Sequence, residues 1–172
     1  YAESQGGDVN RIDTRTFKSV GIRPQPSSTD EKLRWNWNTP IATGKANKKN
    51  IYTGAQYLYR SADQGRTWFK ISPDLTTNDK RKQEQEKSGG LSADNTSAEN
   101  HCTIFTIAES PLDANIIWVG TDDGNLQYTV DGGKTWTNVS TNYALAGIPA
   151  QTWVSSVEPS VFDKNVIYAT FD

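Results

Sequence analysis

The sequence predicts an all-β protein, and in particular a segment of a β-propeller built of four-stranded antiparallel blades. The first observation is an octet of the form [S/T]-x-D-x-G-x-T-W, which occurs at residues 61–68 and again at 129–136. The second is an apolar pair that opens a strand three times, as Ile51-Tyr52, Ile117-Trp118 and Ile167-Tyr168. Four-stranded units that repeat at about 40–50 residues are typical of propeller blades.

Each octet has the chemistry of a tight turn between two strands. A short carboxylate accepts hydrogen bonds from the backbone of its own turn, and a glycine two positions later tolerates a positive φ. The tryptophan at the end anchors the return strand in apolar surroundings. We therefore interpret the octets as structural rather than catalytic or metal-binding. The residues with that role are Ser61, Asp63, Gly65, Thr67, Trp68, Thr129, Asp131, Gly133, Thr135 and Trp136.

The octets resemble the Asp-box, or BNR repeat, of sialidase-like, sortilin-like and related bacterial β-propellers. Residues 33–41, 71–76, 106–111 and 118–125 look like segments of the large bacterial proteins known as BNR-repeat or sortilin-N-terminal-like glycosyl hydrolases. The resemblance covers nearly the whole chain. It implies an exported protein, located in the extracellular space, the periplasm or the cell envelope.

The chain divides at changes of composition and at the repeated strands. In order, we expect the tail of a preceding blade and an irregular connection (1–34), a blade with the octet 61–68 (35–72), a polar charged insertion (73–101), a blade with the octet 129–136 (102–140), and a linker with the first half of a further blade (141–172). A propeller closes with about 4–8 blades. The expected partners are therefore the remaining blades, from the same longer chain or from other subunits.

The strands of the blades follow from short β-branched and aromatic runs between turn residues. The first blade is expected to contain strands at 35–42, 50–54, 57–61 and 67–71; the second at 102–108, 116–120, 126–129 and 135–139; and the half-blade at 153–157 and 166–170. Within the insertion, the mixed-charge run 79–87 predicts a short solvated helix or a mobile segment.

The composition excludes several classes of function. The net charge of −2 gives no electrostatic basis for binding nucleic acid or an anionic membrane. No apolar run approaches the roughly 20 residues of a membrane-spanning helix, and no signal-peptide pattern begins at Tyr1. The chain contains no Met, which we interpret as a segment of a longer protein. The single Cys102 excludes an internal disulfide, and we expect it to be a buried thiol in a strand.

A glycoside hydrolase would need two carboxyl groups, about 5–5.5 Å apart for retention or about 6.5–9.5 Å apart for inversion of the anomeric centre. The alternating strands place the octets and the turns between first and second strands at one end of the blades. The loops between second and third strands and the connections between blades lie at the opposite end, where ligands are expected. The catalytic candidates at that end are Asp122, Asp123 and Glu99, with Asp94 behind them. Residues 122–125 are also compatible with an ordinary hairpin turn. A sialidase is disfavoured because no arginine follows Arg81.

A binding or scaffold function is the reading that we prefer, for a protein, peptide or glycan ligand. The candidate ligand-binding residues are Trp35, Trp37, Asn125 and Tyr143, since exposed aromatic rings stack on sugars and on peptide side chains. No cofactor or metal is predicted: the neighbours His101 and Cys102 have no further ligand to complete a zinc set. A calcium ion at Asp122, Asp123 and Asn125 is an alternative, although the spacing is not that of a dedicated calcium loop.

Overall fold

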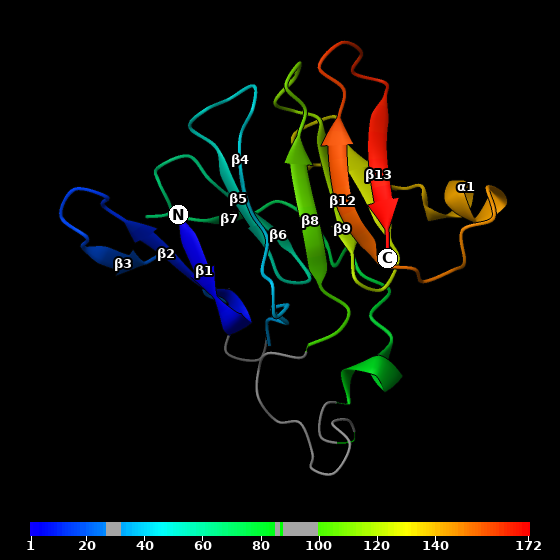
Figure 1. Cartoon of the computed structure of the whole chain (residues 1–172), viewed down its shortest axis with the longest axis horizontal. Helices are drawn as coiled ribbons and strands as arrows, with labels where there is room; N and C mark the ends of the chain where they lie inside the picture. Colours follow the sequence, from blue (N-terminus) through cyan, green and yellow to red (C-terminus); the bar gives the residue numbers. More distant parts are fainter. Residues whose placement is uncertain (27–31, 85–86, 88–99) are drawn as a thin grey trace.

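The computed structural model describes residues 1–26, 32–84, 87 and 100–172, and its architecture is almost entirely β (Figure 1). The first sheet contains β1 (Ala2–Ser4), β2 (Asp8–Ile12) and β3 (Ser19–Gly21), with the 3-10 turn η1 (Gln5–Gly7) between its first two strands. The second contains β4 (Ile41–Thr43), β5 (Ile51–Gly54), β6 (Leu58–Ser61) and β7 (Phe69–Lys70).

The later sheets follow after a long connection that contains the 3-10 helix η2 (Lys80–Gln83). The third sheet is formed by β8 (Ile104–Glu109), β9 (Ile117–Thr121), β10 (Leu126–Thr129) and β11 (Thr137–Asn138). A short helix, α1 (Ser140–Leu145), then leads to the two-stranded sheet of β12 (Val154–Pro159) and β13 (Ile167–Phe171). Every strand pair is antiparallel, and strands adjacent in sequence are adjacent in their sheet.

The second, third and fourth sheets pack against one another through their first strands, β4, β8 and β12. Strand β8 packs between β4 and β12 (Figure 1). Glycines permit this close approach: a Cβ on Gly54 would lie 2.7 Å from Ile104 Cγ2, and one on Gly120 would lie 2.5 Å from Val154 Cγ1. The second and third sheets enclose a core of Tyr52, Leu58, Leu75, Ile104, Ile107, Ile117 and Val119. The repeated packing of four-stranded antiparallel sheets confirms the predicted all-β propeller segment.

Both octets form hairpin turns with the same hydrogen bonds. In the first, Asp63 accepts hydrogen bonds from the backbone N–H and the hydroxyl of Thr67, at 2.9 and 2.7 Å. Asp131 accepts the corresponding pair from Thr135, at 3.0 and 2.6 Å. The Ser61 and Thr129 hydroxyls each donate to the octet carboxylate and accept from the glycine N–H four positions later. Those glycines, Gly65 and Gly133, have φ values of 80° and 101°.

The octet carboxylates should make the stability of the fold fall in acid. Hydrogen bonds from the Thr67 N–H and hydroxyl lower the pKa of Asp63 to about 2, and the Thr135 hydroxyl and N–H hold the pKa of Asp131 below its usual range. Because the pKa of each carboxylate is lower in the folded chain than in the unfolded chain, the ionised carboxylates stabilise the fold. Their contribution to the free energy of unfolding is complete above the unfolded-state pKa of about 4 and is lost as the pH falls toward 2. Urea unfolding of the double variant Asp63→Asn and Asp131→Asn should show a smaller loss of stability over this range than the native chain. An identical loss in both proteins would contradict the prediction.

The predicted strand at 35–42 is wrong over most of its length, since β4 begins only at Ile41. Asn36 holds the residues just before β4 in a turn. Its Oδ1 accepts the Asn38 N–H at 2.9 Å, and its carbonyl accepts the Thr39 hydroxyl at 2.8 Å. Pro40 then has no N–H to donate to a strand partner. Residues 1–34, for which the tail of a preceding blade and an irregular connection are expected, contain the three strands β1, β2 and β3.

Two further segments differ from their predictions. Cys102 is buried, as predicted, but it precedes β8 and has a φ of 60°, outside any strand. Residues 140–145, which straddle the predicted end of the second blade and the linker, form the helix α1. Within the described ranges of the chain, no helix has the length and apolar character needed to cross a bilayer.

Candidate functional site

One end of the sheets carries the turns β5–β6 and β9–β10 together with residues 71–84 and 100–103 of the connection after β7 and the connection 139–153. We call this end the loop face; the octet turns lie at the other end because the strands are antiparallel. A pocket of about 400 Å³, the loop-face pocket, opens here, and its size is in the range of small-molecule sites. Its walls are formed by Lys32, Arg34, Gln56, Tyr57, Asp74, Asn78, Lys80, Gln83, Asn100 and His101.

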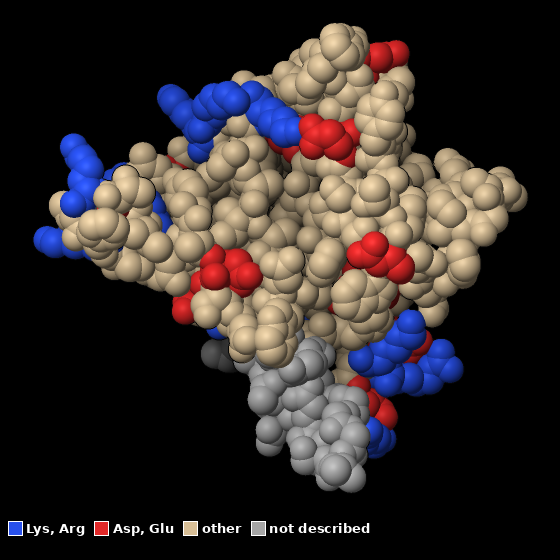
Figure 2. Space-filling view, viewed as in Figure 1, with Lys and Arg blue, Asp and Glu red and all other residues tan. Residues whose placement is uncertain are grey.

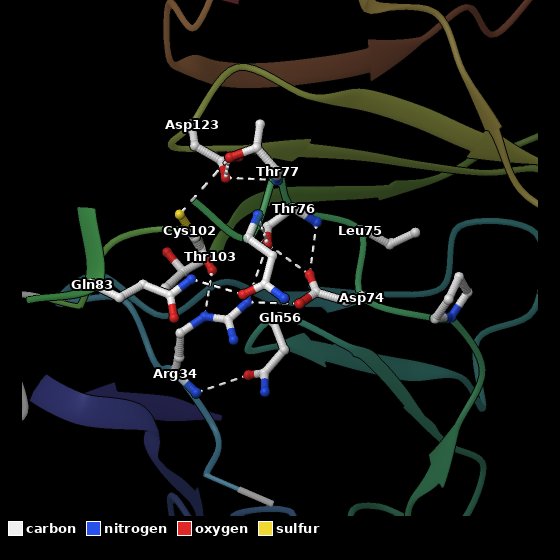
Figure 3. A network of polar contacts seen from close by, with 12 residues as sticks. Arg34, Gln56, Asp74, Leu75, Thr76, Thr77, Gln83, Cys102, Thr103 and Asp123 are labelled. Carbon is white, nitrogen blue, oxygen red and sulfur yellow. Dashed lines mark hydrogen bonds and ion pairs between the residues drawn. The ribbon is translucent and has the colours of Figure 1, made fainter. Parts of the chain in front are cut away.

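Arg34 organises the floor of the loop-face pocket (Figure 3). Its guanidinium forms an ion pair with Asp74 at 2.8 Å and donates to the Thr76 hydroxyl at 3.1 Å and the Cys102 carbonyl at 3.0 Å. Its backbone N–H donates to Gln56 Oε1 at 2.8 Å. The Arg34 and Asp74 side chains are largely buried. Through its backbone and its side chain, Arg34 therefore joins the segment before β4 to the β5–β6 turn, the connection after β7 and the segment before β8.

The outer wall of the pocket comes from η2 and the residues before it. Lys80 Nζ and Gln83 Nε2 both donate to Asn78 Oδ1 at 2.8 Å. Asp79 caps the helix by accepting the Arg81 N–H at 3.0 Å, and the Arg81 side chain lowers the pKa of Asp79 by hydrogen bonding to it. Basic side chains project from η2 at the lower right of the molecule (Figure 2). The pocket thus has three cationic lining residues, Lys32, Arg34 and Lys80, and the carboxylate of Asp74.

Asp122, predicted as a catalytic carboxylate, lies inside the protein with 1% of its surface exposed. Its oxygens accept hydrogen bonds from the Thr103 N–H at 2.8 Å, the Thr103 hydroxyl at 2.6 Å and the Asn36 amide at 3.1 Å. Burial raises the pKa of Asp122, against the effect of the Thr103 hydrogen bonds and of His101, whose Nδ1 lies 3.7 Å away. The geometry assigns the carboxylate to holding the loops together.

Asp123 is equally buried. It accepts hydrogen bonds from the Thr121 hydroxyl at 2.5 Å and from the N–H and the hydroxyl of Thr77, both at 2.7 Å. These contacts fasten the connection after β7 to the β9–β10 turn (Figure 3). The other acidic candidates, Glu99 and Asp94, lie outside the described residues.

The exposure expected for two of the aromatic candidates is wrong. Trp35 is buried against Gly7, where an added Cβ would lie 2.3 Å from the indole, and it stacks on Tyr59 with ring centroids 6.4 Å apart. Tyr143 is buried beside Phe171, at a centroid distance of 4.8 Å. Neither ring is available to a ligand on the loop face.

The other predicted ligand-binding residues lie nearer to solvent. Trp37 is 50% exposed in the turn before β4. Asn125 is partly buried, and its side chain donates to the Leu75 carbonyl at 3.0 Å and accepts from Asn138 at 3.1 Å. Among the described residues, no group of three or more His, Cys, Asp or Glu side chains is placed to hold a metal ion.

Several residues of the site have no clear signature in the sequence. Trp153 is 39% exposed and packs against Phe105 and His101, with ring centroids 5.4 and 6.3 Å apart. In the sequence, Trp153 is the first residue of the predicted strand 153–157, and nothing there indicates a contact with His101. Arg34 and Asp74 are likewise separated by forty residues, so their pairing becomes apparent only in the folded chain.

Comparisons with known proteins detect the fold and no family. No protein-family model matches the chain, and no curated protein matches it. Among solved structures, a GH74 enzyme from Niastella koreensis is 18% identical with a TM-score of 0.58, covering 98% of this chain and 24% of its own. An ancestral GH74 enzyme is 20% identical with a TM-score of 0.45, covering 76% of this chain and 15% of its own. GH74 enzymes are β-propeller glycoside hydrolases, and the chain spans less than a quarter of the length of either one.

Proposed function

We propose that this chain is part of a glycan-binding β-propeller whose binding site includes the loop-face pocket. The observation that carries the proposal is the lining of this pocket, which combines amide, ammonium, guanidinium, imidazole and phenol groups. Sugar hydroxyls both donate and accept hydrogen bonds, and amide side chains match them in both respects. The Arg34 network fixes the orientation of several of these groups before a ligand arrives, which reduces the entropy lost on binding.

Aromatic rings on the same face support a glycan over a small charged metabolite. The exposed Trp37 precedes β4, and Trp153 precedes β12, so both indoles lie at the loop-face ends of first strands. Indole faces stack on the apolar face of a pyranose ring. A glycan ligand also agrees with the similarity of the fold to the GH74 enzyme from Niastella koreensis.

The repeated octets support assignment to the Asp-box, or BNR-repeat, propellers. Both turns form the same set of hydrogen bonds, and both place a tryptophan against the preceding sheet. With that assignment we propose an exported protein whose remaining blades come from the same longer polypeptide or from other subunits. Mass spectrometry of the protein isolated from its source, with mapping of both ends, tests the first alternative directly.

Glycoside hydrolysis is the second candidate, favoured by the similarity of the fold to GH74 enzymes. Among the described residues of the pocket wall, Asp74 supplies the carboxylate, and Arg34 already neutralises it. A two-carboxylate mechanism therefore needs a further acid, for which Glu99 remains the candidate. Release of new reducing ends from oligosaccharides, abolished by Glu99→Gln, would establish the hydrolase.

Lys80→Ala should weaken glycan binding without unfolding the protein. Lys80 is on the pocket wall, and the loss of one charged donor should raise the Kd by about tenfold. Calorimetric titrations with hexasaccharides of glucan, xylan and galacturonan provide the measurement. The matched control is Lys82→Ala, because Lys82 lies on the same helix but donates to Gln151 at 2.8 Å, away from the pocket. Equal affinities of the two variants, or no binding to any of the three sugars, would refute the proposal.

A further inference from the structure

A second pocket adjoins the loop-face pocket. It has a volume of about 340 Å³ and is lined mainly by the connection between β3 and β4; we call it the flanking pocket. Two residues, Lys32 and Asn100, line both pockets. The other walls of the flanking pocket include Arg23, Leu33 and Trp35. The two pockets therefore lie side by side, and one extended ligand can contact both.

Two amide side chains hold the boundary between the pockets in place. Gln56 Nε2 donates to the Lys32 carbonyl at 2.9 Å, and Gln56 Oε1 accepts the Arg34 N–H at 2.8 Å. Asn100 Nδ2 donates to the Trp35 carbonyl at 3.0 Å. The backbone from Lys32 to Trp35 is thus anchored at three points, so the exposed Lys32 side chain starts from a fixed position at the junction of the two pockets.

Each pocket also holds a cationic side chain of its own in a defined position. In the flanking pocket, the Arg23 guanidinium lies over the Trp35 ring, 5.3 Å from its centroid, and the ring face attracts and orients the cation. In the loop-face pocket, Lys80 Nζ donates to Asn78 Oδ1 at 2.8 Å and to Gln83 Oε1 at 3.4 Å. An aromatic face and two amide oxygens carry no net charge, so these contacts position the two cations without neutralising them.

Positive charge exceeds negative charge across the described walls of the two pockets. Among these residues Asp74 supplies the carboxylate, and it is already paired with Arg34 at 2.8 Å. Arg23, Lys32 and Lys80 make up the excess. Cations that line a cleft raise the local concentration of anions, and ammonium and guanidinium groups form strong, charge-assisted hydrogen bonds to anionic oxygens. The local charge is therefore opposite in sign to the net charge of −2 of the whole chain.

We propose that the two pockets together bind an acidic oligosaccharide built of uronic acids, whose carboxylates interact with Arg23, Lys32 and Lys80. The inference rests on the proposed glycan-binding function and adds the class of glycan. A uronate chain carries a carboxylate on successive sugars, which matches cations distributed over adjacent pockets. The planar guanidinium of Arg23 fits the two coplanar oxygens of a carboxylate, and the amide groups of the walls pair with the sugar hydroxyls.

Calorimetric titrations of the 172-residue chain with hexasaccharides test the class of glycan. Galacturonan and its methyl ester share a backbone and differ in charge. Galacturonan should bind about tenfold more tightly than the ester, and raising the NaCl concentration from about 20 mM to about 200 mM should reduce this preference severalfold by screening.

Four outcomes of these titrations would overturn the inference. Equal binding of the methyl ester, or tighter binding of glucan or xylan, would overturn it and leave the proposed glycan-binding function standing. A preference that persists unchanged at high salt would arise from the size of the ester and not from charge. Tighter binding of sulfated galactan than of galacturonan would assign the cations to sulfate. Absence of binding to every sugar would overturn the inference together with the proposed function.

Two single variants test whether one ligand occupies both pockets. Arg23→Gln and Lys80→Gln each remove one charge from a different pocket, and each should raise the Kd of galacturonan about tenfold. Both side chains are exposed, so the thermal midpoints should stay unchanged. The affinity for the methyl ester should change much less in both variants.

Two further variants serve as matched controls. Arg15→Gln removes an arginine that is 89% exposed in the β2–β3 turn, and Lys82→Gln removes the η2 lysine that donates to Gln151. Neither should change the Kd of galacturonan. Weaker binding in only one of Arg23→Gln and Lys80→Gln, or equal weakening in the controls, would overturn binding across both pockets.

Discussion

Replacing Glu109 with alanine should lower the free energy of unfolding by about 4 kcal/mol. This carboxylate is buried at the end of β8 and accepts four hydrogen bonds. Its Oε1 accepts the backbone N–H groups of Ala46 and Asn47, both at 2.9 Å. Its Oε2 accepts the Asn50 amide at 2.9 Å and the Tyr52 hydroxyl at 2.5 Å. Alanine leaves these donors without their partner, and the Asn50 and Tyr52 side chains are buried.

The position of Glu109 explains why the effect should be large. All four donors belong to the β4–β5 turn or the start of β5, so one side chain fastens the third sheet to the second. The pKa of Tyr52 is raised mainly by burial of its hydroxyl and, to a smaller extent, by the neighbouring Glu109 carboxylate. The phenol therefore remains neutral at pH 7 and keeps its donor proton.

Urea unfolding at pH 7 of Glu109→Ala and Glu158→Ala measures the effect against a matched control. Glu158 belongs to β12, the corresponding strand of the next sheet, but it is exposed and forms an ion pair with Lys45. An exposed pair of this type contributes below about 1 kcal/mol. Glu109→Gln should fall between the two, because an amide retains one acceptor oxygen. Equal losses for Glu109→Ala and Glu158→Ala would show that the buried carboxylate does not join the sheets.

The sequence was sufficient for features whose partners lie within a few residues. In each octet the groups that hydrogen-bond to one another are at most four residues apart, and the same hydrogen bonds form in both turns. The strand order also follows from local rules, since every sheet is a series of antiparallel neighbours. This is why the all-β propeller fold could be predicted from a repeated motif and a repeated apolar pair.

The candidate site depends on contacts between distant residues, which local patterns do not reveal. Asp123 follows a strand and precedes a glycine, which fits a turn as well as a catalytic loop. Besides the nearby Thr121, its carboxylate is engaged by Thr77, which is 46 residues away. Trp35 has the composition of an exposed platform, but the backbone of Gly7 packs on its indole. Burial of both residues is set by the insertion and by the first sheet, whose placement no short pattern specifies.

Replacing Arg34 with methionine should lower the free energy of unfolding by about 3 kcal/mol. Methionine keeps much of the apolar stem, but it removes the ion pair with Asp74 and the hydrogen bonds to Thr76 and to the Cys102 carbonyl. The remaining Asp74 carboxylate is then partly buried opposite an apolar side chain. If the loss arises from this unpaired charge, adding Asp74→Asn to Arg34→Met should restore part of the stability.

Arg81→Met is the control that separates burial from ion pairing in this prediction. Arg81 contacts Asp79 at 2.9 Å, nearly the Arg34–Asp74 distance, but 89% of its side chain is exposed against 11% for Arg34. Its replacement should change the stability by less than about 1 kcal/mol in urea unfolding. The sugar titrations then distinguish the roles of the two arginines: Arg34→Met should also weaken glycan binding, since the pocket floor loses its fixed geometry, whereas Arg81→Met should leave the affinity unchanged. Equal stability losses for the two variants would mean that Arg34 contributes only as an ordinary surface charge, and the preorganised loop-face pocket would lose its physical basis.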